Sequence, residues 1–251
     1  MDIVGFQSIE LDMGRVKFLN RVEKKYWFHY SQLPQLFEVI HQDYFLLQVG
    51  KEQNLKYTST YFDTPEDTMY IDHHNGRLNR YEIRRRDYTF SGDSYLEVKV
   101  KNNKGKTKKK RLLTATQSLH LDARESTFLA KYSPFSSSDL RASLVNEFSR
   151  FTLVNKNFRE TCNIDFNIRY GVPQKSVSLD GLVVLEIKSE ANSPISSLAR
   201  ALRESRIKEA GFSKYSVGRS LTSTHLKRNR FKPQIRRIEK MLEPSNKLYN
   251  V

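Results

Sequence analysis

The segment that decides the fold is RYEIRRRDY, residues 80–88, which is followed by SYLEVKVK at residues 94–101 and TKKKRLLT at residues 107–114. In the first two, charged and apolar side chains alternate with a period of two residues. This is typical of β-strands, because successive side chains point to opposite faces. A turn around Gly92 and the sequence NNKG at residues 102–105 would join the three as hairpins. We therefore expect an antiparallel meander with one strongly charged face.

The flanking sequence predicts further strands and several helices. More strands are expected at residues 21–27, 57–63, 157–170 and 182–190, and helices at residues 31–45, at residues 196–211 and after Pro233. PEDTMYIDHHNGR, residues 65–77, predicts a turn-rich connection with a hairpin turn at its Asn-Gly pair. Residues 118–150 are expected to be mainly helical, because Leu140, Leu144 and Phe148 recur at helical spacing.

Composition restricts the kind of protein and its partners. The 251 residues carry 43 Lys and Arg against 28 Asp and Glu, a formal net charge of +15, which indicates a polyanionic partner. Cys162 is the single cysteine, so the chain can form neither an internal disulfide nor a thiolate metal cluster. No signal peptide is apparent in the acidic first residues, and no apolar stretch reaches the roughly 18 residues of a membrane span. We therefore expect a cytoplasmic protein.

The charged strand faces have a further consequence if the strands curl into a barrel. Helices would cover the apolar outer wall, most aromatic side chains would lie there too, and the cations would point inward. Like charges removed from water repel strongly, so such a lumen needs water and a polyanion. Glu23, Glu97 and Glu186 each lie two residues before a lysine on the same face. Hard carboxylate oxygens of this kind suit Mg²⁺ or Mn²⁺ in phosphoryl chemistry.

The order of the motifs resembles a known family. RVEKKYW, YTSTYFDT, RYEIRRRDY, YLEVKVK, LEIK and FSKYSVG follow one another as in the VTC-type polyphosphate polymerase domain, a branch of the CYTH-like triphosphate tunnel metalloenzymes. The resemblance covers residues 21–221. It implies an α+β fold, an antiparallel β-barrel tunnel with helices packed outside and a C-terminal helix. We expect a tunnel domain over residues 1–226 and a basic helical appendage over residues 227–251.

The resemblance, together with the strand faces, gives a set of candidate site residues. The candidate catalytic residues are Lys25, Arg84, Arg86, Lys99, Lys109, Arg159, Lys188 and Lys214. The candidate substrate-binding residues are Arg80, Lys101, Arg111 and Tyr215, and the candidate metal ligands are Glu186, Glu23 and Glu97, for Mn²⁺ or Mg²⁺. The chain departs from the family pattern at Thr161, where an arginine is expected, and at Glu82, where a basic residue is common.

The implied activity is transfer of the terminal phosphoryl group of a nucleoside triphosphate to a growing polyphosphate chain, with a membrane protein as a further candidate partner. Two alternatives use the same tunnel: hydrolysis of tripolyphosphate or nucleoside triphosphates, and binding of polyphosphate or an inositol polyphosphate without catalysis. Nucleic-acid binding is the general alternative for a basic, aromatic-rich chain, but no nucleic-acid motif occurs in the sequence. Adjacent His73 and His74 lack a third ligand for a metal site.

Overall fold

The computed structural model describes residues 5–10, 21–104, 106–114 and 119–243. Its eleven strands form one mainly antiparallel sheet, whose main path runs in the order β2-β11-β9-β8-β4-β5-β6-β7, with β1 and β3 paired parallel at one side. The strands are β1 Gln7–Glu10, β2 Arg21–His29, β3 Tyr44–Gln48, β4 Leu55–Asp63, β5 Arg80–Tyr88, β6 Asp93–Lys101, β7 Thr107–Thr114, β8 Arg141–Asn155, β9 Glu160–Val172, β10 Lys175–Leu179 and β11 Leu182–Glu190.

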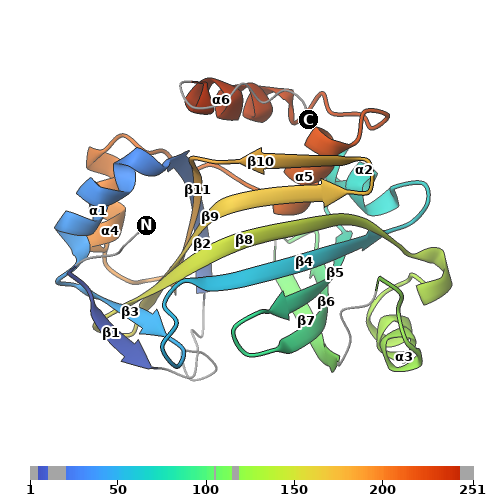
Figure 1. Ribbon diagram of the computed structural model, residues 1–251, viewed down its shortest axis with the longest axis horizontal. Helices are drawn as coiled ribbons and strands as arrows, with labels where there is room; N and C mark the ends of the chain where they lie inside the picture. Colours follow the sequence, from blue (N-terminus) through green and yellow to red (C-terminus); the bar gives the residue numbers. More distant parts are fainter. Residues whose placement is uncertain (1–4, 11–20, 105, 115–118, 244–251) are drawn as a thin grey trace.

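Six α-helices surround this sheet (Figure 1). They are α1 Leu33–Ile40, α2 Thr68–His74, α3 Ala123–Tyr132, α4 Ser197–Glu204, α5 Lys214–Thr222 and α6 Lys232–Leu242. Helices α1 and α4 lie side by side, and their apolar residues form one buried cluster with the apolar faces of β2, β9 and β11. A second and larger cluster includes residues of α2, α5 and α6. The expected α+β fold, with an antiparallel sheet of the tunnel type and helices packed outside it, is confirmed. The sheet of the expected barrel is not strictly closed, because no ladder in the described part of the chain joins β2 to β7.

The helical prediction for residues 118–150 is wrong over most of its length. Among its described residues only α3 is α-helical, a short 3-10 turn follows at Ser137–Asp139, and the chain then forms β8, the strand between β9 and β4. Leu144 and Phe148 are four residues apart, a spacing that places side chains together on a helix but equally on one face of a strand. Because β8 also buries Phe151 and Leu153 against the α1 and α4 cluster, the alternation that would reveal a strand is missing.

The turn-rich connection predicted for residues 65–77 contains α2. Asp63, fully buried at the end of β4, accepts hydrogen bonds from the backbone N–H groups of Met69 and Tyr70 at distances of 2.9 and 3.0 Å. These are N–H groups of the first helical turn, which have no partner inside the helix. Gly76 follows α2 with a φ of 72°, so the Asn-Gly pair ends a helix and does not close a hairpin.

The C-terminal helix α6 packs on the larger cluster. Its Ile235, Ile238 and Leu242 are buried, and the guanidinium of Arg237 lies 4.4 Å from the ring centre of Trp27 on β2. The division of the chain at residue 226 stays a prediction, and residues 244–251 of the expected appendage lie outside the described residues. Residues 11–20 also lie outside them, as does Gly105, which belongs to the hairpin expected at residues 102–105. No helix in the described part of the chain combines the length and apolar character needed to cross a membrane.

Candidate functional site on the charged face of the sheet

The charged face is defined by side chains of alternate residues on β2, β11, β9, β8, β4, β5, β6 and β7. Its most buried carboxylate is that of Glu97 on β6, which is 0% exposed. Arg84 on β5 donates to it from Nε and Nη2 at 2.7 and 2.6 Å, and Lys109 on β7 donates from Nζ at 2.8 Å. Burial alone would raise the pKa of Glu97, but Arg84, Arg86 and Lys109 outweigh it and hold the pKa well below its usual range.

Arg86 lies on the same face, two residues further along β5. Its Nε donates to the hydroxyl of Ser59 at 3.1 Å, and its guanidinium lies 5.6 and 5.4 Å from the ring centres of Tyr57 and Phe148. The residue is 8% exposed, and no carboxylate in the described part of the chain forms an ion pair with it. Burial, and after it the charge of Arg84, lowers the pKa of Arg86. A buried guanidinium without a counter-ion is the feature that an incoming anion would complete.

A second group of charges centres on Asp165 of β9. Arg150 of β8 donates to its two oxygens at 2.5 and 2.9 Å, and Lys214, the first residue of α5, donates to one of them as well. The Nζ atom of Lys214 also lies 4.6 Å from the ring centre of Phe148. Burial lowers the pKa of Lys214 to about 8, with Asp165 opposing the shift and Arg150 adding to it. Lys214 thus adds a positive charge from α5 to the charged face.

The third group lies on the neighbouring strands β11 and β2. The carboxylate of Glu186 contacts Lys188 at 3.0 Å and Lys25 at 3.4 Å. Burial opposes ionisation of Glu186, but Lys188, Lys25 and Arg150 outweigh it and hold its pKa well below the usual range. The influence of Arg150 shows that this group adjoins the one centred on Asp165.

The fourth group explains the departure at Glu82. Lys99 of β6 donates to Glu82 at 3.1 Å, and Arg84 lies 3.7 Å from the same oxygen. Burial, and then the charge of Arg84, lowers the pKa of Lys99 to about 8. Burial would raise the pKa of Glu82, but Lys99 and Arg84 bring it down to about 2. The carboxylate therefore balances two cations that would otherwise repel each other.

Residues 20–223 match the model of the family described as the VTC domain, which is most of the chain. The chain belongs to the VTC domain family. The resemblance expected from the order of the sequence motifs is confirmed. No curated protein gives a significant match to this VTC domain.

Several solved structures resemble the VTC domain at low sequence identity. A Vibrio parahaemolyticus protein, a proposed adenylate cyclase, is 10% identical with a TM-score of 0.47, over 80% of this chain and 98% of that one. A Hippeastrum protein, a proposed adenylyl cyclase with a dominant triphosphatase activity, is 14% identical with a TM-score of 0.47, over 82% and 99%. A Pyrococcus horikoshii protein is 11% identical with a TM-score of 0.42, over 74% and 88%. We transfer no activity from these structures to the VTC domain.

The charged face of this VTC domain carries more cations than carboxylates. Its cations are Lys25, Arg84, Arg86, Lys99, Lys109, Arg150, Lys188 and Lys214, and its carboxylates are Glu82, Glu97, Asp165 and Glu186. The face therefore carries an excess of positive charge. Seven of the eight predicted catalytic residues thus lie on one face of the sheet.

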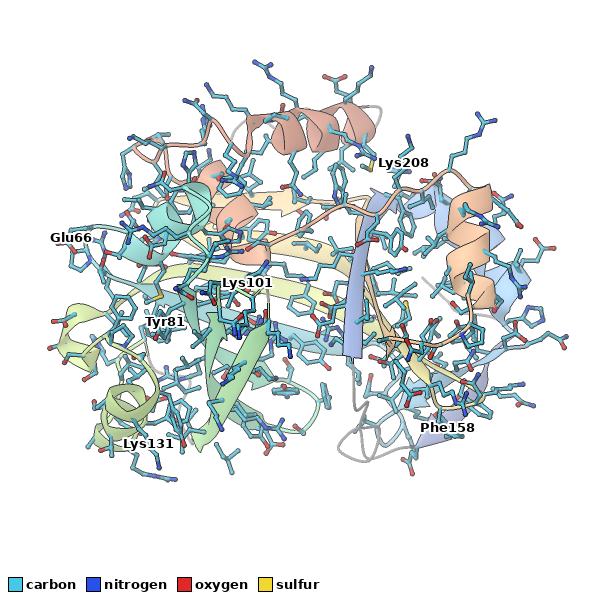
Figure 2. The ribbon with its side chains drawn as sticks, turned by 180° about the vertical axis from the view of Figure 1, so that it is seen from behind. Glu66, Tyr81, Lys101, Lys131, Phe158 and Lys208 are labelled. Atoms are coloured by element: carbon cyan, nitrogen blue, oxygen red, sulfur yellow. The ribbon has the colours of Figure 1, made fainter. Side chains whose placement is uncertain are left out.

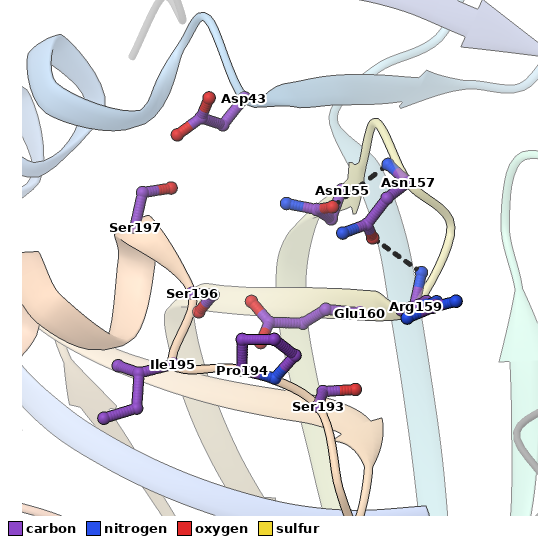
Figure 3. Close-up of a pocket in the computed structure, with 10 residues that line it drawn as sticks. All are labelled: Asp43, Asn155, Asn157, Arg159, Glu160, Ser193, Pro194, Ile195, Ser196 and Ser197. Carbon is purple, nitrogen blue, oxygen red and sulfur yellow. Dashed lines mark hydrogen bonds between the residues drawn. The ribbon is translucent and has the colours of Figure 1, made fainter.

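Arg159, the eighth predicted catalytic residue, lies elsewhere. It is exposed, immediately precedes β9, and lines a separate cavity of about 180 Å³ with Asp43, Asn155 and Glu160 among its neighbours (Figure 3). In the described part of the chain no hydrogen bond or ion pair links its side chain to the charged face. Arg159 lies at the end of the β9–β11 pairing, where its carbonyl accepts a hydrogen bond from the N–H of Glu190 at 3.4 Å.

The predicted substrate-binding residues lie nearer the edges. The guanidinium of Arg80 donates to the carbonyl of Arg77 at 2.8 Å, and that of Arg111 lies 4.8 Å from the ring centre of Tyr95. Lys101 is half-buried at the end of β6, opposite Arg80 (Figure 2). These cations could contact the ends of a long anion more readily than its centre.

Tyr215 is not available to a ligand in this arrangement. It is 3% exposed, its hydroxyl donates to Asp63, and its ring stacks on Tyr61 at a centroid distance of 5.0 Å. Since Asp63 also caps α2, the tyrosine fixes the first turn of α5 to the sheet. Its contacts indicate a role in placing Lys214.

Sequence reasoning missed Arg150 and Asp165, which form a bidentate ion pair on the charged face. Arg150 falls in the segment mistaken for a helix, so its face could not be assigned. Asp165 follows the alternation of charged and apolar residues in β9, but the sequence did not show that Arg150 is its partner. The expected outward position of the aromatic residues is also wrong for Tyr57 and Phe148, whose rings lie beside Arg86 and Arg150.

The three predicted metal ligands are not gathered into one site. Among the described residues no three His, Cys, Asp or Glu side chains lie close enough to hold a metal ion together. Both oxygens of Glu97 are engaged by Arg84 and Lys109, and Glu23 is exposed near the start of β2. Both oxygens of Glu186 also contact lysines, Lys25 and Lys188, but its side chain is 18% exposed where that of Glu97 is 0% exposed. Glu186 is therefore the more accessible of the two, and it suits a metal whose coordination the ligand's own phosphate oxygens complete.

Proposed function

We propose that the charged face binds the phosphoanhydride chain of a nucleoside triphosphate or of polyphosphate, and that the domain transfers the terminal phosphoryl group to a polyphosphate acceptor. The observation that carries this proposal is Arg86, a buried guanidinium that lies beside the stacked rings of Tyr57 and Phe148 and forms no ion pair with a carboxylate in the described part of the chain. A linear polyanion supplies negative charge for Arg86 and for the other cations in excess. Its shape also suits a row of cations that extends over eight strands.

Phosphoryl transfer asks little covalent chemistry of a protein. Its transition state spreads negative charge over the phosphoryl oxygens, so catalysis rests on alignment and on fixed positive charge. Arg84 and Arg150 are held in place by bidentate contacts to Glu97 and Asp165. Their orientation is therefore set before the ligand arrives. Lys99 and Lys214 add positive charge beside them.

A divalent metal, Mn²⁺ or Mg²⁺, fits this proposal at Glu186. Mg²⁺ commonly binds one or two carboxylates together with substrate phosphates, so a single ionised glutamate is an adequate protein ligand. The metal would neutralise charge on the phosphate oxygens. Lys25 and Lys188 hold the Glu186 carboxylate in position and keep it ionised.

The test is to incubate the purified protein with ATP and Mn²⁺ or Mg²⁺ and to identify the products. Long-chain polyphosphate supports the polymerase, orthophosphate alone supports the hydrolase, and binding without turnover supports a non-catalytic binding domain. Failure to bind ATP or tripolyphosphate at low salt would remove the proposal altogether.

The metal assignment needs its own comparison. We expect Glu186→Gln to lose metal-dependent turnover while it still binds tripolyphosphate without metal. Glu204→Gln, an exposed position on α4, removes the same charge away from the charged face and should behave as wild type. Full metal-dependent activity in Glu186→Gln would show that the metal is held elsewhere.

A further inference from the structure

A second cavity, of about 410 Å³, lies at the end of the sheet where β8 begins, β9 ends and α5 ends. Its volume is within the range of small-molecule sites. The residues that line it are basic or uncharged: Arg141, Ala142, Ser143, Val172, Pro173, Gln174, Arg219, Thr222, Ser223, Thr224 and His225. None of its lining residues is acidic, in contrast to the charged face. The two sites share strands β8 and β9 and helix α5, but they use different residues of each.

The innermost basic side chain of this cavity is incompletely paired. Arg219 has a side chain that is 6% exposed, donates from Nη2 to Asp67 and donates from Nη1 to the carbonyl of Ser143 at 2.9 Å. Its Nε has no hydrogen-bond partner in the described part of the chain. Buried donors are rarely left unpaired in proteins, because the lost hydration is costly. Arg219 thus lines the cavity and keeps one buried donor without a partner.

Two more basic side chains face the same carboxylate. Nε2 of His225 lies 3.3 Å from Asp67, and the guanidinium of Arg141 lies 4.0 Å from it while donating to the carbonyl of Pro65 at 2.8 Å. Both side chains are more than half exposed, at 66% and 53%. Since Arg219 already neutralises Asp67, Arg141 leaves the cavity with an excess positive charge.

We propose that this cavity is a second phosphate-binding site, separate from the charged face. Arginine presents several N–H donors in a plane that matches phosphate oxygens, and the hydroxyls of Ser223 and Thr224 add donors beside it, whereas that of Thr222 already donates to the carbonyl of Gly218 at 2.9 Å. The choice of phosphate over other oxyanions rests on the proposed function. The ligand is either free orthophosphate or the terminal phosphate of a phosphoanhydride chain.

Helix α5 connects the two sites mechanically. Lys214, on the charged face, is its first residue and Thr222, at the cavity, is its last. At 1.5 Å per residue these positions lie about 12 Å apart along the helix. Arg219, on the same helix, holds the cavity end through Asp67, which precedes α2. A phosphate in the cavity would thus contact the helix that carries Lys214.

The experiment measures orthophosphate and tripolyphosphate binding by calorimetry on the full chain. Arg141→Gln/His225→Gln removes the two exposed basic groups of the cavity and should fold normally, which its melting temperature verifies. Lys227→Gln/Arg228→Gln, at exposed positions outside the cavity, is the matched control. Arg86→Met alters the charged face alone. Acetate serves as a control for unspecific anion binding.

We expect the cavity variant to bind orthophosphate about tenfold more weakly, as for loss of a charged hydrogen bond, with the matched control unchanged. That result identifies free orthophosphate as the ligand. If only tripolyphosphate binding weakens, in the cavity variant as well as in Arg86→Met, the ligand is the end of the chain.

Unchanged binding of both anions in the cavity variant, or equal binding of acetate, would overturn the second site. Wild-type protein that binds orthophosphate in the cavity but no tripolyphosphate would instead refute the proposed function and leave the cavity as a phosphate site.

Discussion

Arg84 and Arg86 are two residues apart on one strand face, and their replacement by methionine should have opposite consequences. Methionine keeps much of the side-chain volume and removes the charge in both cases. Arg84 is the main partner of the fully buried carboxylate of Glu97, whereas Arg86 has a hydroxyl and two aromatic rings as its neighbours. We therefore expect Arg84 to contribute mainly to the stability of the fold and Arg86 mainly to ligand binding.

The magnitudes follow from these contacts. Arg84→Met leaves Glu97 with Lys109 alone, and breaking a buried ion pair in this way costs about 3–5 kcal/mol. For a chain of this size that lowers the melting temperature by about 6–20 °C. Arg86→Met loses one hydrogen bond to Ser59 but removes a buried charge that Arg84 repels, so we expect its stability within about 1 kcal/mol of wild type. The same change should weaken tripolyphosphate binding about tenfold to a hundredfold.

Thermal unfolding with and without tripolyphosphate measures both quantities, because a ligand that binds only the folded state raises the melting temperature. The expected pattern is a low melting temperature for Arg84→Met, and a normal one with a reduced ligand response for Arg86→Met. Lys108→Met, on the outward side of β7, serves as the control for loss of one positive charge. If Arg86→Met proves as unstable as Arg84→Met, or keeps the full ligand response, Arg86 is not the uncompensated cation that we infer.

Two lysines and one helix provide further tests. Anion binding should raise the pKa of Lys99 and Lys214 from about 8, so the protein should take up protons when it binds tripolyphosphate at pH 8. Calorimetry in buffers of different ionisation enthalpy measures this proton uptake. If no protons are taken up, the ligand does not bind near either lysine. In the free protein the pKa values of Lys99 and Lys214 lie below the ordinary 10.5, so between pH 8 and 10.5 the unfolded chain binds more protons than the folded one. The free energy of unfolding should therefore rise with pH in that window. Denaturant titrations of Lys214→Met should show a smaller rise than those of the wild type. Ile238→Ala, at a 1% exposed position of α6, should cost about 2–5 kcal/mol of unfolding free energy, whereas loss of less than about 1 kcal/mol would favour an independent appendage after residue 226.

The sequence predicted the strands whose two faces differ in chemistry. Around Arg84 and Glu97, charged residues alternate with Ile83, Leu96 and Val98, and the structure buries those three apolar residues on the opposite side. Most of the candidate site could be predicted because the alternation of residues within one strand shows which side chains share a face, even when the neighbouring strands are unknown.

The prediction failed where both faces of a strand are apolar, or where a contact joins residues of different elements that the sequence pattern does not connect. In β8, Phe148 faces the cations and Phe151 faces α1 and α4, so no alternation marks the strand and Arg150 remains unassigned. Likewise, the capping of α2 by Asp63 depends on a residue outside the helix, and a helix of seven residues shows little periodicity of its own. Arg159 fits the strand pattern in sequence, but it lies at the end of the β9–β11 pairing, where its side chain is exposed.

Strand β7 ends the main path of the sheet, and no described strand pairs with its free side. An unpaired edge can add a strand from another molecule, which is a route to aggregation. Lys108, Lys109, Lys110 and Arg111 place four successive positive charges on this edge, and the pairing of Lys109 with Glu97 accounts for only one of them. Lys108 and Lys110 project from the opposite side of β7, where they make a second copy of the chain an unfavourable neighbour. We therefore expect these outward lysines to oppose edge-to-edge pairing of two copies, and their removal should reduce solubility before it affects anion binding.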